Sequence, residues 1–197
     1  MVIDLKKCIG CFGCQALCKS ENATLPGVNW SRVIFSESGI FPKVRKDPLP
    51  MLCMHCQDPL CVRVCPTGAS SKRSDGIVII DEVKCLGCES CVVACPYQAR
   101  SLLSKATEYY VGQGLTPFEK VSHKRHTVGV VEKCNFCVQR LEKGLEPSCV
   151  AGCMANARYF GNIDDPESEV SKMAVSKRAF RLHTELGTEP SVYYLAP

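Results

Sequence analysis

The residues of this chain best suited to chemistry are its cysteines, of which there are 16 in 197 residues. They form four groups of four, and every group opens with a two-residue gap and closes with a three-residue gap. In chain order, groups one to four are Cys8, Cys11, Cys14 and Cys18; Cys53, Cys56, Cys61 and Cys65; Cys85, Cys88, Cys91 and Cys95; and Cys134, Cys137, Cys149 and Cys153. Such regular spacing predicts that the thiols bind metal.

Two other thiol chemistries fit this spacing less well. Disulfides need an oxidising compartment, and cysteines only two or three residues apart would form strained bridges or none. Structural zinc favours two Cys-x2-Cys knuckles around one ion, which does not explain why the third and fourth thiols follow so closely in groups one and three. Group four, with eleven residues between its second and third cysteines, is the best zinc candidate when taken alone.

Cubane iron–sulfur clusters account for the whole pattern. In two-cluster ferredoxins a Cys-x2-Cys-x2-Cys loop holds three corners of one cluster, and a fourth thiol three residues further on binds the neighbouring cluster. A proline commonly follows that fourth thiol, as it does in Cys65-Pro66 and Cys95-Pro96 but not after Cys18 or Cys153. The sequence therefore predicts [4Fe–4S] clusters, with a zinc-binding structural module as the remote alternative.

The elements that position these thiols are predicted from an internal repeat. The stretch Lys7–Cys11 corresponds to Lys84–Cys88, and each follows a short strand-like run, Val2–Leu5 and Val78–Asp81 respectively. The repeated unit is expected to be a strand, a cysteine loop with glycine in its tight turn, and a short helix. Since two such units make one two-cluster module, four cysteine groups predict two modules.

At this point the chain resembles a known family, the four-cluster iron–sulfur (beta) subunits of the complex iron–sulfur molybdoenzymes. Members serve dimethyl sulfoxide, polysulfide, thiosulfate and respiratory arsenate reductases. The similarity covers nearly the whole chain and is carried by Val2–Cys8, Cys65–Ala69, Cys95–Tyr97, Glu132–Cys137, Arg140–Cys149 and Gly161–Pro166. The eleven-residue gap of group four is a feature of this family that simple ferredoxins do not share.

The resemblance implies an α+β fold of two bacterial-ferredoxin-like two-cluster modules related by an internal repeat, with extended connecting loops and a C-terminal helix and tail. Groups one and four would form module 1 (residues 1–50 plus 126–161), and groups two and three would form module 2 (residues 51–103). Residues 104–125 are expected to be a connecting loop. Residues 162–197 are expected to be the C-terminal helix and tail, with the helix near 167–178 and a final strand or extended tail at Pro190–Leu195.

The resemblance also implies four [4Fe–4S] clusters whose fourth ligands are exchanged within each module. The expected ligands are Cys8, Cys11, Cys14 and Cys153 for cluster 1; Cys18, Cys134, Cys137 and Cys149 for cluster 2; Cys53, Cys56, Cys61 and Cys95 for cluster 3; and Cys65, Cys85, Cys88 and Cys91 for cluster 4. Some relatives replace a thiol of group three and hold a three-iron cluster, whereas this chain keeps Cys88. All sixteen thiols are thus expected to be iron ligands, and no catalytic residue is expected.

Composition and charge set further limits. The hydrophobic fraction of 46% includes the cysteines, so a thin apolar core and folding that depends on bound iron are expected. No apolar run approaches the ~20 residues of a membrane span, and no secretory signal precedes the first cysteine group. The formal charge of +4 would fall to about −4 with four clusters of about −2 each, so the basic balance does not predict a nucleic-acid partner.

Because cysteine completes every expected ligand set, no iron is left open to substrate, and such saturated clusters suit outer-sphere electron transfer. We therefore expect a non-catalytic electron-transfer subunit of an oxidoreductase complex. By the resemblance, it would relay electrons between a molybdopterin (Mo or W) catalytic subunit and either a membrane quinone subunit or a soluble carrier. The alternative is a free polyferredoxin-type carrier. The resemblance also implies the periplasmic membrane face, reached by co-export with a signal-bearing catalytic subunit, with the cytoplasm as the alternative.

The histidines and one basic run are expected to lie outside this chemistry. His55, inside group two, is interpreted as a polar residue at a loop surface or docking face, rather than as a ligand or a hydrogen-bond donor to a sulfide. The basic run Lys120–Arg125 is expected to be a solvated loop. The remaining histidines are expected at the surface, and they are His123, His126 and His183.

Overall fold

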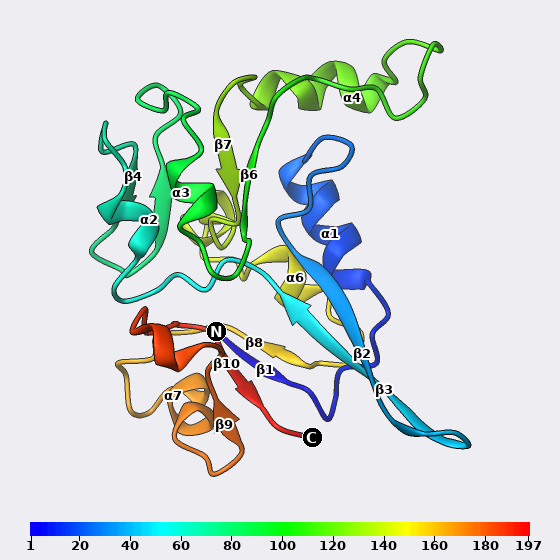
Figure 1. Ribbon diagram of the computed structural model, residues 1–197, viewed down its shortest axis with the longest axis vertical. Coiled ribbons are helices and arrows are strands. Elements are labelled where there is room, and N and C mark those ends of the chain that lie inside the picture. Colours follow the sequence, from blue (N-terminus) through cyan, green and yellow to red (C-terminus); the bar gives the residue numbers. More distant parts are fainter.

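Both ends of the chain contribute to one four-stranded sheet in the computed structural model, which describes residues 1–197 (Figure 1). Strand β1 (Val2–Asp4) pairs in antiparallel fashion with β8 (Arg158–Tyr159) and in parallel with β10 (Tyr193–Leu195). Strand β9 (Ala179–Phe180) completes the sheet beside β10. Helix α7 (Glu169–Ala174) packs against this sheet through Val170.

The segment 162–197 thus contributes β9 and β10 to the sheet, and β10 is the final strand, one of the two alternatives expected at Pro190–Leu195. Helix α7 is shorter than the predicted helix, and a 3-10 helix (Thr184–Leu186) follows β9. Strand β10 lies inside the sheet because its neighbours on both sides supply partners, and Tyr194 is fully buried there. The Tyr194 hydroxyl donates a hydrogen bond of 2.7 Å to the Pro50 carbonyl oxygen.

Short elements frame the cysteine groups. The strands predicted before groups one and three are present as β1 and β5 (Val78–Ile80), and β5 pairs with β4 (Ser70–Lys72). Strand β6 (Arg100–Leu102), after group three, pairs with β7 (Val131–Lys133), before group four. The helices that carry cysteines or follow them are α1 (Gly13–Asn22), α2 (Leu60–Arg63), α3 (Ser90–Val93), α5 (Val138–Leu141) and α6 (Ser148–Ala151).

Two segments project from the same side of the molecule (Figure 1). One is the hairpin of β2 (Arg32–Ile40) and β3 (Lys43–Met51). The other is the predicted connecting loop 104–125, which contains helix α4 (Pro117–Ser122) and a 3-10 helix (His123–Arg125). The basic run is thus helical, not a loop, because the side chains of Thr116 and Glu119 cap the first turn of α4 reciprocally.

The apolar interior is small and is built partly from thiols. Only 49 of the 197 residues are buried, and the largest buried apolar cluster has 16 residues, including Cys14, Cys53, Cys134 and Cys149. Aromatic side chains such as Tyr97, Phe136 and Tyr194 complete this cluster. The cysteine groups therefore lie at the centre of the fold. None of the helices has the length and apolar character that a bilayer crossing requires.

The buried hydroxyl of Tyr194 gives a test of how the two ends of the chain are joined. In Tyr194→Phe the Pro50 carbonyl loses its buried donor, and we expect the free energy of unfolding to fall by about 1 kcal/mol. Tyr194→Ala should cost about 3–5 kcal/mol, since it also leaves a cavity. Anaerobic guanidinium unfolding followed by far-UV circular dichroism measures both. Tyr193→Phe, on the same strand but only partly buried, is the control, and a loss in the control equal to that in Tyr194→Phe would contradict the assignment.

Candidate metal centres

Three cavities are each walled by four cysteines. Their cysteines are Cys8, Cys11, Cys14 and Cys153 in the first; Cys53, Cys56, Cys61 and Cys95 in the second; and Cys65, Cys85, Cys88 and Cys91 in the third. Each combines three cysteines of one group with one cysteine of another group, in the same combinations as the expected ligand sets of clusters 1, 3 and 4.

The remaining four thiols also converge. Cys18, Cys134, Cys137 and Cys149 are all buried. The Cys18 thiol lies within electrostatic range of Cys149 and Cys137, and the Cys134 thiol within range of Cys18 and Cys149. The Asn22 amide nitrogen lies 3.5 Å from Cys18 Sγ and 3.7 Å from Cys137 Sγ. The sixteen cysteines thus form four quartets in space, each with three cysteines of one sequence group and one of another. Quartets 1 to 4 carry the numbers of the clusters expected in them.

The donor set suits clusters with several iron atoms. All sixteen cysteines are free thiols, and thiolate is the ligand that iron–sulfur clusters use. No three His, Cys, Asp or Glu side chains converge closely enough to hold one metal ion. Instead, three of the quartets surround a cavity, and a cluster with four iron corners needs its ligands spread in this way. The residues present therefore fit [4Fe–4S] clusters.

Two glycine turns shape the loops of groups one and three. Gly10 and Gly87 have φ values of 68° and 67°, and the residues two positions later, Phe12 and Glu89, have 59° and 58°. A side chain at Gly87 would collide with the carbonyl oxygen of Gly129. Glycine is needed here because it alone adopts this backbone without a steric cost and also leaves room for the approaching chain. The two loops consequently present their cysteines in the same way.

Hydrogen-bond donors around the thiols favour their ionised form. Backbone N–H groups reach sulfur atoms in each module, at 3.4 Å from Ser70 to Cys65 and at 3.3 Å from Ala157 to Cys153. Burial alone would raise the pKa of Cys65, but the N–H of Ser70 and the hydroxyl of Thr67 lower its pKa to about 7. Donors of this kind stabilise negative charge on a thiolate or on a cluster that it holds.

Burial works in the opposite direction at the inner quartets. Removal from water raises the pKa of the Cys18 thiol to about 12 and that of Cys56 to about 12, and it raises the pKa of Cys134 well above the ordinary value. The metal-free chain thus holds neutral thiols at these positions. Cluster binding must release their protons, and the positively charged iron core then offsets the cost of burying thiolates.

Electrostatic interactions between thiols of neighbouring quartets indicate a linear order. Cys149 of quartet 2 interacts electrostatically with Cys14 of quartet 1, and Cys134 of quartet 2 with Cys53 of quartet 3. Arg100 lies within electrostatic range of both Cys61 of quartet 3 and Cys91 of quartet 4. The four quartets therefore follow one another as 1, 2, 3 and 4.

His55 lies at the junction of the two middle quartets. Its imidazole is fully buried and stacks on Phe136, with ring centroids 3.7 Å apart. Its Nδ1 accepts a hydrogen bond of 3.1 Å from the Val78 N–H. The interpretation of His55 as a loop-surface residue is therefore wrong, because the loops of groups two and four pack face to face. Burial lowers the pKa of His55 and keeps the ring neutral.

The expectation that the other histidines are exposed holds for His183 but fails for His126. The His126 side chain is buried, with Nδ1 at 2.5 Å from a carboxylate oxygen of Glu132 and Nε2 at 3.0 Å from the carbonyl oxygen of Asn22. This contact fastens the end of the projecting 104–125 segment to helix α1. His123 is partly buried.

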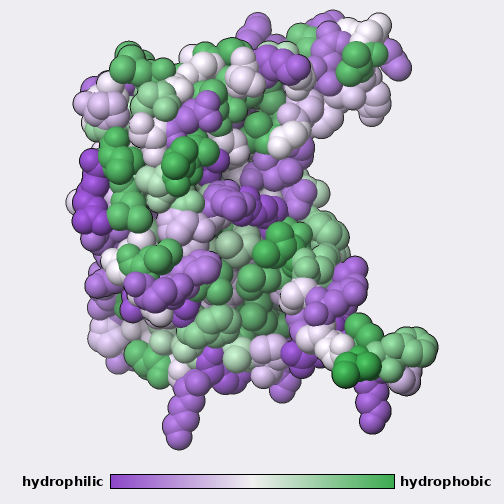
Figure 2. All heavy atoms as spheres, in the orientation of Figure 1, coloured by the Kyte–Doolittle hydropathy of each residue, from purple (hydrophilic) through white to green (hydrophobic).

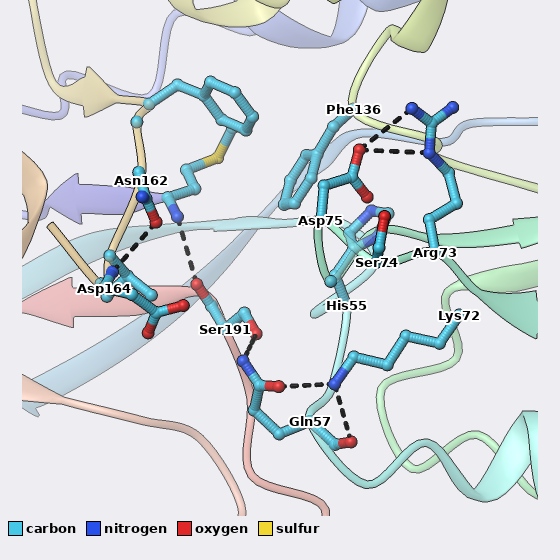
Figure 3. Close-up of a pocket in the computed structure, with 15 residues that line it drawn as sticks. His55, Gln57, Lys72, Arg73, Ser74, Asp75, Phe136, Asn162, Asp164 and Ser191 are labelled. Atoms are coloured by element: carbon cyan, nitrogen blue, oxygen red, sulfur yellow. Dashed lines mark hydrogen bonds and ion pairs between the residues drawn. The ribbon is translucent and has the colours of Figure 1, made fainter.

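A further cavity, of about 480 Å³, has no cysteine in its lining (Figure 3). It is bounded by the turn between β4 and β5, by the loop at residues 160–164, and by His55 and Phe136. Its polar side chains satisfy one another, with Arg73 paired to Asp75, Lys72 hydrogen-bonded to Gln57 and the Asn162 side chain accepting from the Asp164 N–H. Its lining offers no thiol to a metal cluster.

Comparison with known proteins agrees with this geometry. The family described as "4Fe-4S dicluster domain" matches residues 44–110 and 104–163, and a second family of the same description matches residues 7–69. A subunit of the selenate reductase of Mesobacillus selenatarsenatis is 45% identical over 99% of this chain and 70% of its own length. The arsenate respiratory reductase iron–sulfur subunit of a Shewanella species is 39% identical over 99% of this chain and 94% of its own.

A putative dimethyl sulfoxide reductase iron–sulfur subunit of Halobacterium salinarum is 40% identical over 99% of this chain and 78% of its own length. Together, the two dicluster matches and these end-to-end similarities account for all four cysteine groups. The chain belongs to the family of 4Fe-4S dicluster iron–sulfur subunits of multi-subunit respiratory reductases.

Proposed function

We propose that this chain binds one [4Fe–4S] cluster in each quartet and passes electrons along the four clusters within a larger oxidoreductase. The observation that carries the proposal is the gathering of all sixteen thiols into four quartets that adjoin one another in sequence 1 to 4. The membership of these quartets supports the exchanged ligand sets. The two glycine turns with matching backbone angles support an internal repeat. We also propose the module boundaries 1–50 plus 126–161 and 51–103, because each pair of ranges holds the cysteines of two quartets.

The bound clusters would supply one-electron chemistry, and the chain would control access to them. Cysteine saturates every iron, so substrate has no open position and transfer is outer-sphere. The thiols of quartet 2 are all buried, whereas Cys11 of quartet 1 and Cys88 of quartet 4 are exposed. Electrons would therefore enter and leave at the two ends of the relay, while the middle is shielded from water.

The names of the relatives and the exposed ends of the relay, at quartets 1 and 4, suggest which partners this chain has. The relatives are named as subunits of selenate, arsenate and tetrathionate reductases, which supports a catalytic partner for this chain. We propose that this partner is a molybdopterin-containing subunit and that the opposite end of the relay meets a membrane quinone subunit or a soluble carrier. We further propose a place at the periplasmic membrane face, reached by co-export with the catalytic subunit.

An exposed apolar surface beside quartet 1 suits the catalytic subunit. Ile40 and Phe41, at the hairpin end, are 85% and 87% exposed. Figure 2 shows hydrophobic spheres at the tip of the hairpin with hydrophilic ones beside them, and α1 lies between the hairpin and the α4 segment in Figure 1. Ile9 and Phe12, in the loop of group one, are also exposed, and Phe12 packs on Phe35 of the hairpin. A free carrier has no need of such a surface, whereas a permanent interface buries one.

Metal analysis tests the proposal directly. Anaerobically purified protein should contain about sixteen iron atoms and a matching amount of acid-labile sulfide, because four cubanes each hold four of both. Dithionite reduction should produce a spectrum of interacting paramagnetic clusters by electron paramagnetic resonance. A folded protein that contains zinc and no iron would contradict the proposal and favour the zinc-binding module.

Exchange of the fourth ligands gives a second test. Cys18→Ser should damage cluster 2, although Cys18 belongs in sequence to group one, because its thiol lies with Cys137 and Cys149. Its resonance spectrum should resemble that of Cys134→Ser and differ from that of Cys11→Ser, the matched variant for cluster 1. A Cys18→Ser spectrum that instead matched Cys11→Ser would show that the ligand pairing is wrong.

The proposed docking surface is tested by co-purification. Phe41→Asp places a charge at the apolar hairpin end, so recovery of the catalytic subunit with this chain should fall about tenfold. Val83→Asp is the control, since Val83 is 97% exposed but lies beside group three, and it should leave recovery unchanged. Both variants should retain full iron. Wild-type recovery with Phe41→Asp would rule out the hairpin as the contact, and an active wild-type monomer would favour the free carrier.

A further inference from the structure

One buried arginine occupies the corresponding place in each module. Arg100 follows Cys95 by five positions and begins β6, and Arg158 follows Cys153 by five positions and begins β8. An alanine precedes each of them. Both residues are only 4% exposed, and each lines one of the cysteine-walled cavities.

Arg100 lies between the two quartets of module 2. Its Nη2 donates to Cys61 Sγ of quartet 3 at 2.9 Å, and its Nη1 donates to the Ser70 hydroxyl at 2.7 Å. The guanidinium is also within electrostatic range of Cys91, a member of quartet 4. One cation thus faces thiols of both quartets.

Arg158 has the same relation to the two quartets of module 1. Its Nη2 donates to Cys14 Sγ of quartet 1 at 3.2 Å and to the Ser31 hydroxyl at 3.3 Å. Cys149 of quartet 2 lies within electrostatic range of the same guanidinium. The buried Nη1 of Arg158 has no hydrogen-bond partner within the chain.

Neither guanidinium has a carboxylate partner, since no salt bridge in the structure includes Arg100 or Arg158. A buried cation without a counter-charge is strongly unfavourable. The groups able to provide that charge are the thiolates and the clusters they would hold. Arginine suits this position better than lysine because its rigid fork can donate in several directions at once.

We propose that Arg100 and Arg158 each bridge the two clusters of their own module and raise the reduction potentials of both. This inference rests on the proposed function. Reduction adds one electron to a cluster, supplied by its neighbour in the relay, and makes the cluster more negative. A fixed cation between two clusters stabilises the reduced form of each, so the two arginines set the potentials in pairs. They are positioning and tuning residues and take no part in any bond change.

Redox titration of the purified holoprotein, followed by electron paramagnetic resonance, tests the proposal. In Arg158→Gln, two of the four reduction potentials should fall by about 59 mV. This shift corresponds to a tenfold change in the equilibrium constant of a one-electron reduction. In Arg100→Gln the other two should move, and in the double variant all four. Arg158→Lys and Arg100→Lys should lower the potentials less than the glutamine variants do, because the positive charge remains.

Arg32→Gln is the matched control. Arg32 donates to the backbone carbonyls of Tyr97 and Gln98 and contacts no thiol, so its loss should leave all four potentials in place. Iron content distinguishes a failure of the proposed function from a failure of the bridging role. A wild-type protein without four clusters would overturn the proposed function. Variants with full iron and unchanged potentials, or with only one potential moved by each substitution, would overturn the bridging role alone. If a glutamine variant fails to fold, the lysine variant decides.

Discussion

The structure depends on bringing thiols from distant parts of the chain to common points. Cys153 joins Cys8, Cys11 and Cys14 around one cavity, and β8, which follows Cys153, pairs directly with β1, which precedes Cys8. With only 49 buried residues, apolar burial alone gives this arrangement little support. Metal–thiolate bonds would supply the cohesion that a larger domain obtains from its core. The short strands and one-turn helices are thus best understood as supports for the cysteine loops.

Electrostatics inside the two modules follows from the same arrangement. Four negative clusters close together would repel one another and resist reduction. Backbone N–H groups directed at sulfur and two buried guanidiniums offset this negative charge. No carboxylate pairs with those guanidiniums. Other cations of the molecule do pair with carboxylates, for example Arg178 with Asp4 and Arg140 with Glu21.

Much of the candidate site could be predicted from the sequence because cysteine spacing is a local signal with a direct chemical meaning. The strands before Cys8 and Cys85 and the glycine turns at Gly10 and Gly87 lie within a few residues of the ligands. What the sequence did not reveal depends on long-range packing. Nothing near His55 indicates that Phe136 covers it, and nothing near Tyr194 indicates that β1 and β9 flank its strand. The role of Arg158 was missed for the same reason, although its spacing from Cys153, shared by Cys95 and Arg100, was a visible signal.

The pairing of β1 with β8 and β10 has a consequence for biosynthesis. Groups two and three are neighbours in the chain, so the thiols of quartets 3 and 4 leave the ribosome early, although β6 must still wait for its partner β7. Quartets 1 and 2 must wait for Cys149 and Cys153, and the sheet around β1 is complete only after β10, at residues 193–195, has emerged. During that interval the first four cysteines are unprotected thiols, open to oxidation and to the wrong metal. Reducing conditions would protect these thiols until the clusters that they would hold can form.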